Sequence, residues 1–172
     1  LDETMDISVA KATLKSLKKF AQESPQSKFF MIGMADFTLG YCECDLCKQR
    51  NEKYGTRGGT VAVFMNVIAR EMKKWAAETY PEGREINIIF FAYRWIESPP
   101  VVKTANGYDP VHEHVVLEDN IFVRIAPIVA NYAYGFTDKR QDLDQVQMIE
   151  GWSSIAKNLM FWDYQNQYKN YL

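Results

Sequence analysis

Apolar residues follow two spacings along this chain, one typical of helices and one typical of buried strands. Steps of three and four residues predict amphipathic helices over residues 6–22, 60–80 and 143–157. Short unbroken apolar runs predict strands over residues 29–34, 85–93, 121–125 and 159–162. The polar segment before Thr60 is expected to be a long loop. The segment 94–120 shows no clear helical pattern, and a short extra strand is expected in it around residues 115–117.

Strands that alternate with helices indicate an α/β fold with parallel strands, because a parallel pair needs a long connection that a helix usually supplies. Four strands fit half of a barrel or a small open sheet. The long segments after the first three strands favour the barrel, in which such loops carry function. A complete (β/α)8 barrel needs about 250 residues. We therefore expect these 172 residues to form a partial (β/α)8 barrel of the TIM type, its C-terminal half.

Residues 1–172 are accordingly predicted to be a single, incomplete barrel domain that lacks its N-terminal strands. The start on Leu1 rather than on a methionine agrees with an upstream segment that was removed or left out. A half barrel leaves strand edges without partners. We therefore expect the missing N-terminal part of the barrel to be a partner of this chain, and self-association to occur without it.

Composition excludes several classes of protein. Apolar residues make up 47% of the chain and charged residues 24%, which is usual for a globular protein and not for a disordered one. No apolar run approaches the roughly 20 residues of a membrane span. The net charge is -2, with lysines and arginines spread among acids, so no nucleic-acid partner is expected.

Aspartates and aromatic residues gather where the predicted strands end. In a parallel sheet these ends share one face, which would collect Asp36, Tyr93, Arg94, Trp95, Trp162, Asp163 and Tyr164. Two carboxylates among aromatic rings suit cleavage of a glycosidic bond, because one acid protonates the leaving oxygen and the other carboxylate acts as base or nucleophile. Asp36 and Asp163 are thus the catalytic candidates, and the remaining residues are substrate-binding candidates. Alternatively, each aspartate caps a loop or pairs with an arginine.

Arg124 is a further substrate-binding candidate, because it lies within an otherwise apolar predicted strand. An unpaired charge is costly there, so the side chain should point into the barrel mouth or pair with a carboxylate. A structural ion pair and a contact with an acidic substrate both satisfy this requirement.

Three cysteines, Cys42, Cys44 and Cys47, form one local cluster in the sequence. Their thiols are placed to bind a soft metal such as zinc, with a fourth ligand from elsewhere. His112 and His114 are candidates for that ligand, although two histidines in a polar loop are more often solvated. A disulfide that leaves one thiol free is the competing interpretation if the protein is exported. No other cofactor is required by the predicted chemistry.

Several of these features occur in an order that resembles a known family. They are the Cys-x-Cys-x-x-Cys run after Asp36, the helix segment 64–69 with Asn66, Ala92-Tyr93 followed by Pro99-Pro100, and Trp152 followed by Trp162-Asp163-Tyr164. Together, from about Phe29 to Leu172, they resemble the domain-of-unknown-function family 4838. The resemblance implies a barrel related to glycoside hydrolases of the alpha-glucuronidase and beta-hexosaminidase kind, here without its first strands and N-terminal accessory domain. It transfers no catalytic residue.

The resemblance also implies an exported bacterial protein, periplasmic, at the cell surface or extracellular, that acts in polysaccharide degradation with carbohydrate as its partner. Our leading hypothesis is that this chain is part of a glycoside hydrolase and is inactive alone. Two alternatives stay open. One is a non-catalytic carbohydrate-binding barrel, and the other is a fragment in which the cysteine cluster is a structural metal site.

Overall fold

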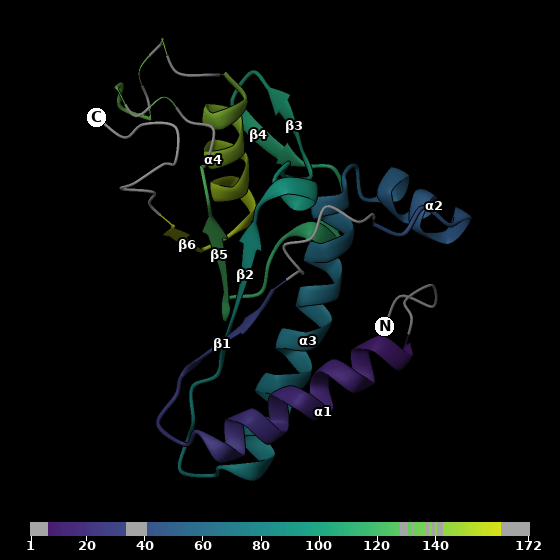
Figure 1. The fold of residues 1–172 in the computed structure, drawn as a ribbon, viewed down its shortest axis with the longest axis vertical. Helices are drawn as coiled ribbons and strands as arrows, with labels where there is room; N and C mark the ends of the chain where they lie inside the picture. Colours follow the sequence, from purple (N-terminus) through teal and green to yellow (C-terminus); the bar gives the residue numbers. More distant parts are fainter. Residues whose placement is uncertain are drawn as a thin grey trace.

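Four parallel strands lie side by side in the order in which they occur along the chain (Figure 1). A computed structural model of the protein describes residues 7–33, 41–127, 131, 133–136, 138, 140 and 143–162. The strands of the sheet are β1 (Phe29–Ile32), β2 (Asn87–Ala92), β5 (Ile121–Ile125) and β6 (Asn158–Phe161). Each pairs in parallel with the next. The predicted α/β class and the four predicted strands are confirmed.

The described residues form four α-helices, of which three were predicted and one was not. The predicted helices are α1 (Ile7–Glu23), α3 (Arg57–Thr79) and α4 (Leu143–Ile155), and the fourth is α2 (Asp45–Lys53). The prediction of a loop up to Thr60 is therefore wrong at two points. α2 lies within that segment, and α3 begins three residues early because Thr56 Oγ1 accepts a hydrogen bond from the Gly59 N–H at 3.0 Å.

The helices pack on the sheet in a simple arrangement. α1 packs on α3, α3 packs on β2 and β5, and α4 packs on β6 (Figure 1). Within the part of the chain that the structure describes, none of these helices is long and apolar enough to cross a membrane.

The connection from β2 to β5 contains a β-hairpin and no α-helix, in agreement with the missing helical pattern. It comprises η1 (Arg94–Ile96), β3 (Val101–Thr104), β4 (Gly107–Pro110) and η2 (Glu113–Val115). The strand expected around residues 115–117 is wrong. The side-chain amide of Asn66 binds the carbonyl oxygens of His114 and Val116, and the backbone N–H of Glu118 binds Asn66 Oδ1, so helix α3 takes up the polar groups that a strand partner would use.

One face of the sheet forms the core with α3 and α4. Its side chains alternate along the strands and are almost fully buried, as at Ile88, Phe90, Ile121, Val123 and Ile125. Trp152 of α4 meets Phe90 with the ring centres 5.7 Å apart. Gly151 lets α4 approach the chain before β3, since a Cβ there would lie 2.5 Å from Pro99 Cγ.

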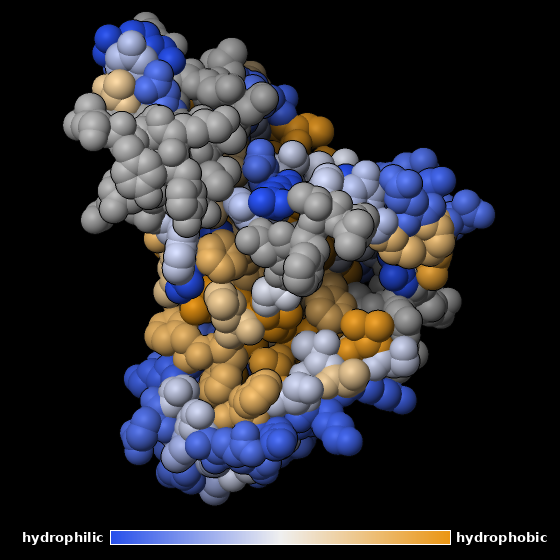
Figure 2. Space-filling view, in the orientation of Figure 1, coloured by the Kyte–Doolittle hydropathy of each residue, from blue (hydrophilic) through white to orange (hydrophobic). Residues whose placement is uncertain are grey.

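The other face of the sheet carries a different set of side chains. We call it the open face, and it consists of Phe29, Met31, Asn87, Ile89, Phe91, Phe122, Arg124, Asn158 and Met160. Phe29 is 44% exposed and Met31 is 54% exposed, so the face is open to solvent over β1. Figure 2 shows apolar side chains gathered over the region of β1, β2 and β5. Because no residue of this face carries a carboxylate, its one charge is that of Arg124.

Candidate functional site at the carboxyl edge of the sheet

The parallel strands bring several predicted site residues to one edge of the sheet. Tyr93, Arg94 and Trp95 directly follow β2, and Trp162 directly follows β6. Because β2, β5 and β6 run in the same direction, these residues share the carboxyl edge. Asp36, Asp163 and Tyr164 lie outside the described residues, so the predicted catalytic pair and one predicted binding residue stay predictions.

Arg124 lies on the open face and contacts two aromatic rings, one on β2 and one directly after β6. Its guanidinium carbon is 5.4 Å from the centre of the Phe91 ring and 5.7 Å from that of Trp162. Both distances are in the range of cation–π attraction. Nη1 lies 3.9 Å from Met31 Sδ, and Nη2 lies 3.7 Å from Met160 Sδ. We call these five residues the Arg124 cluster.

The surroundings of the Arg124 guanidinium are unusual for an arginine. No carboxylate of the described residues pairs with it, and methionine sulfurs are weak acceptors. Trp162 is held beside it, since the Trp162 N–H donates to the Ile125 carbonyl at 2.8 Å and its ring lies 5.7 Å from Phe91. The cluster therefore offers a half-buried cation with polar N–H groups left for an acceptor that approaches along the open face.

A second group of rings lies at the same carboxyl edge, next to the cysteines. The Tyr41 and Trp95 ring centres are 4.9 Å apart with the rings tilted by 59°. The guanidinium carbon of Arg57, the first residue of α3, lies 3.1 Å from the centre of the Tyr41 ring. Trp95 is 37% exposed, so part of its surface faces solvent. We call Tyr41, Arg57 and Trp95 the Trp95 platform.

Arg94 directly precedes Trp95 and has a strained backbone. Its φ is 52°, which makes it the one described non-glycine residue in the left-handed region. Such conformations cluster at functional sites, because packing must hold them against their cost. The Arg94 guanidinium carbon lies 5.2 Å from the centre of the Tyr93 ring. The turn thus fixes the direction of two predicted binding residues at the point where β2 ends.

The three cysteines meet at the N-terminal end of α2. All three Sγ atoms lie within 4.8 Å of one another, and Cys42 Sγ is 3.4 Å from Cys44 Sγ. The thiols are free, with Cys42 and Cys44 exposed and Cys47 half-buried. The cluster can hold a metal ion, as the spacing predicted. Within the described ranges, no histidine or carboxylate joins this group, so His112 and His114 are not its fourth ligand.

Hydrogen bonds among the three cysteines shift the pKa values of two thiols in opposite directions. The backbone N–H of Cys47 and the thiol of Cys42 hydrogen-bond to the sulfur of Cys44 and lower the pKa of the Cys44 thiol. The hydrogen bond to Cys42, together with desolvation, raises the pKa of Cys47 to about 11. Cys44 therefore loses its proton more readily than Cys47 as the pH rises.

The family model for "Domain of unknown function (DUF4838)" matches residues 4–172, which is nearly the whole chain. The chain belongs to the DUF4838 family. No curated protein and no solved structure matches it. The resemblance drawn from the cysteine run, Asn66 and the tryptophans is therefore confirmed for the family itself.

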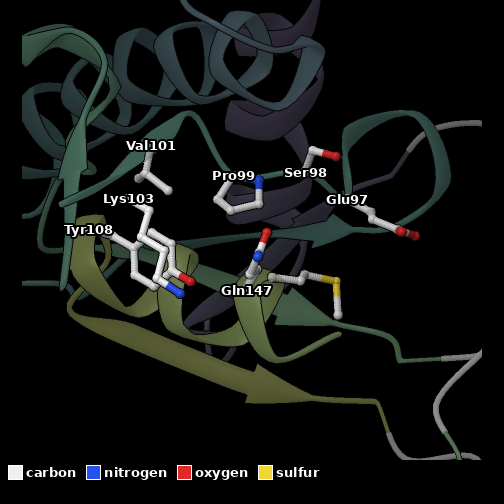
Figure 3. A pocket seen from close by; sticks show the side chains of 8 residues that line it. Glu97, Ser98, Pro99, Val101, Lys103, Tyr108 and Gln147 are labelled. Atoms are coloured by element: carbon white, nitrogen blue, oxygen red, sulfur yellow. The ribbon is translucent and has the colours of Figure 1, made fainter. Parts of the chain in front are cut away.

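The DUF4838 domain has a cavity that is lined by other residues than these groups. A pocket of about 330 Å³ lies between the β3–β4 hairpin and α4, with a volume at the lower end for small-molecule sites. Figure 3 shows Lys103 and Tyr108 alongside each other at one end of it and Glu97 at the other. None of the predicted site residues lines this pocket.

Sequence reasoning missed five of the eight side chains that form the two clusters in this DUF4838 domain. Tyr41 and Arg57 build the platform with Trp95, and Phe91, Met31 and Met160 surround Arg124. Phe91 had a local signal, because strand alternation puts it on the same face as Tyr93. The pairing of Arg57 with Tyr41 had none, since these residues meet only through the folded arrangement of α3.

Proposed function

We propose that this DUF4838 domain is one wall of a (β/α)8 barrel and part of an exported glycoside hydrolase that acts on complex polysaccharide. The observation that supports this proposal is the strand order. Each strand of the sheet is parallel to, and beside, the strand that precedes it in the chain. A barrel is wound in one direction in this way, whereas a doubly wound open sheet reverses its strand order near the middle.

Contacts on the open face also favour a curved sheet. The Phe29 and Phe122 rings meet at 5.1 Å although β2 lies between their strands. Arg124 reaches Met31 across the same strand. Side chains converge on the concave side of a curved sheet, and in a barrel that side faces the interior. The open face is then the barrel lining, and further strands beside β1 and β6 would close it.

The proposed substrate site is the carboxyl edge, where barrel enzymes carry their chemistry. Exposed rings such as those of Trp95 and Trp162 suit the apolar faces of sugars. Arg124 and Arg94 would donate hydrogen bonds to substrate oxygens. Asp36 and Asp163, which follow the first and last strands in the sequence, are the proposed carboxylates, one protonating the leaving oxygen and the other acting as base or nucleophile.

The test uses the complete parent protein and a panel of polysaccharides, with release of reducing ends as the readout. Asp163→Asn should abolish turnover because an amide cannot transfer the proton or attack the sugar. Asp119→Asn is the matched control, since Asp119 is an exposed carboxylate that precedes β5 at the opposite edge of the sheet. Equal loss in both variants, or full activity of Asp163→Asn, would refute the assigned role.

A non-catalytic carbohydrate-binding barrel is the alternative that the same experiment separates. Saturable glycan binding without product at any pH, lost in Trp95→Ala and kept in the control, would support binding in place of hydrolysis. Absence of both binding and product would contradict both versions of the proposal.

We further propose that the cysteine cluster binds zinc. The observation that favours this is the approach of all three Sγ atoms to within 4.8 Å. A zinc ion bound by thiolates at about 2.3 Å holds the sulfurs about 3.8 Å apart in a tetrahedral site, so only small adjustments are needed. This role is structural, because the site lies on the α2 segment and not on a strand end.

A further inference from the structure

Helix α2 packs only weakly on the rest of the described fold. The helix has nine residues and none of them is buried. Helices of this length are marginal in water without tertiary packing, because nucleation costs more than a few hydrogen bonds return. Its N-cap, Cys44, makes no side-chain hydrogen bond of the usual capping kind. Something other than the hydrophobic core must therefore hold the start of this helix.

The C-terminal end of α2 is held by packing and by a hydrogen bond to α3, so its first turn is the part that lacks such contacts. Tyr54, the C-cap residue, is 1% exposed and lies in the core. Asn51 Oδ1 accepts a hydrogen bond from Thr60 Oγ1 of α3 at 2.8 Å. At the first turn, in contrast, Leu46 is 42% exposed and the three sulfurs meet at the surface.

The same turn is covalently joined to the Trp95 platform. Tyr41 directly precedes Cys42, and its ring contacts Trp95 at 4.9 Å and Arg57 at 3.1 Å. Arg57 and Trp95 belong to regular elements, α3 and η1, whereas residues 41–44 have no helix or strand of their own. Tyr41 is thus the member of the platform whose position depends on the cysteine segment.

We propose that one thiophilic divalent metal ion, bound by Cys42, Cys44 and Cys47, is a clip that orders α2 and fixes Tyr41 in the Trp95 platform. Each thiol gives its proton to solvent as its sulfur binds the metal. The ion closes a ring from Cys42 to Cys47 and so joins the residues before α2 to its first turn. The clip rests on the metal site proposed above and adds a function to it. That function is the assembly of the Trp95 platform, whose Tyr41 directly precedes the first ligand, Cys42.

The experiment uses the whole 172-residue chain, with Zn²⁺ and Co²⁺ as the probes. Binding is measured by the metal content of the protein and by sulfur-to-cobalt charge-transfer absorption. Order is measured by amide hydrogen exchange in residues 45–53 and by tryptophan fluorescence, with Trp95→Phe to identify the signal of Trp95. We expect one metal per chain. At a free concentration of about 100 times Kd, exchange in α2 should slow by up to about 100-fold, because the opened form does not bind.

Cys44→Ser and Cys47→Ser should lose both the cobalt band and the protection of α2. Lys48→Ser, an exposed change in the same helix, is the matched control and should keep both. Far-UV circular dichroism verifies that each variant retains α1, α3 and α4. Tyr41→Ala should bind metal normally and lose the Trp95 fluorescence response.

The outcomes separate the two proposals. No metal binding to the wild-type chain would overturn the site and the clip together. Stoichiometric binding that leaves α2 exchange and Trp95 fluorescence unchanged would leave zinc binding standing and overturn the clip. Glycan binding is not a readout here, so failure of the carbohydrate proposal would be visible only in its own assay.

Discussion

Asn66 provides the sharpest test of how this fold holds the connection between β2 and β5. The side chain is 2% exposed and makes three hydrogen bonds. Its Nδ2 donates to the His114 and Val116 carbonyls at 2.9 and 2.8 Å, and its Oδ1 accepts from the Glu118 N–H at 3.0 Å. We predict that Asn66→Ala leaves all three backbone groups without this partner and loosens η2 from α3.

The expected cost follows from counting these bonds. Each contributes about 1 kcal/mol net, so their loss should lower the free energy of unfolding by about 3 kcal/mol. For a domain of this size that corresponds to a fall in melting temperature of about 6–12 °C. Asn66→Asp keeps an acceptor for the Glu118 N–H, but it turns a carboxylate toward two carbonyl oxygens. We therefore expect it to cost at least as much stability as Asn66→Ala.

Urea unfolding followed by circular dichroism measures the effect. Asn106→Ala is the matched control, because Asn106 is exposed at the tip of the β3–β4 hairpin, and it should change stability by less than about 0.5 kcal/mol. A loss in Asn66→Ala of under about 1 kcal/mol would refute the reasoning, since the three bonds would then be replaced by water at little cost.

Three further predictions follow from the same structure. Arg94→Gly should raise the free energy of unfolding by about 0.5 kcal/mol, and with it the melting temperature, because glycine tolerates the positive φ. It should also weaken glycan binding more than Arg94→Lys does. A lower melting temperature would remove the argument from strain. Lys73 donates a hydrogen bond to Asp119 at 2.8 Å and lowers the pKa of that exposed carboxyl. The coupling energy of the pair, about 0.5 kcal/mol in a double-mutant cycle, should be present at neutral pH and vanish as the pH falls through the folded pKa of Asp119. Coupling that persists in acid would contradict this assignment. Phe29→Ser with Met31→Ser should reduce self-association in analytical ultracentrifugation, and a wild-type chain that is already monomeric at high concentration would count against an open barrel lining.

The regular parts of the fold were predictable because burial leaves a pattern in the sequence. β2 and β5 are covered on the helix side and carry mostly apolar residues on the other, so their largely apolar runs identified them. α2 left no such pattern because none of its residues is buried, and periodicity can identify only a helix that packs on something. The β3–β4 hairpin did leave a signal, Asn106-Gly107 at its turn, but no hairpin was predicted there.

The candidate site was predictable in its position and not in its composition. Parallel strands imply that the residues after each strand share an edge, and Tyr93, Arg94, Trp95 and Trp162 lie there. Which side chains touch is a separate matter, decided by contacts distant in the sequence. Arg57 was not among the predicted site residues and lies on Tyr41, because the Thr56 cap starts α3 early enough to bring it there.

The two clusters differ in a way that bears on how the domain would use them. The Trp95 platform consists of neighbours whose rings and cation satisfy one another, so a ligand meets mainly an apolar surface. Arg124 is held by rings and thioethers, which accommodate the cation without matching its five N–H donors. Desolvating a guanidinium without strong acceptors costs stability, and a purely structural role would be filled better by an apolar residue of similar length. This cost is explained if the acceptors come from a substrate or from the strands that would close the barrel. Arg124→Met separates these two cases from a structural role, because it should leave the isolated chain at least as stable as the wild type. It should weaken either substrate binding or association with the closing strands, whichever supplies the acceptor.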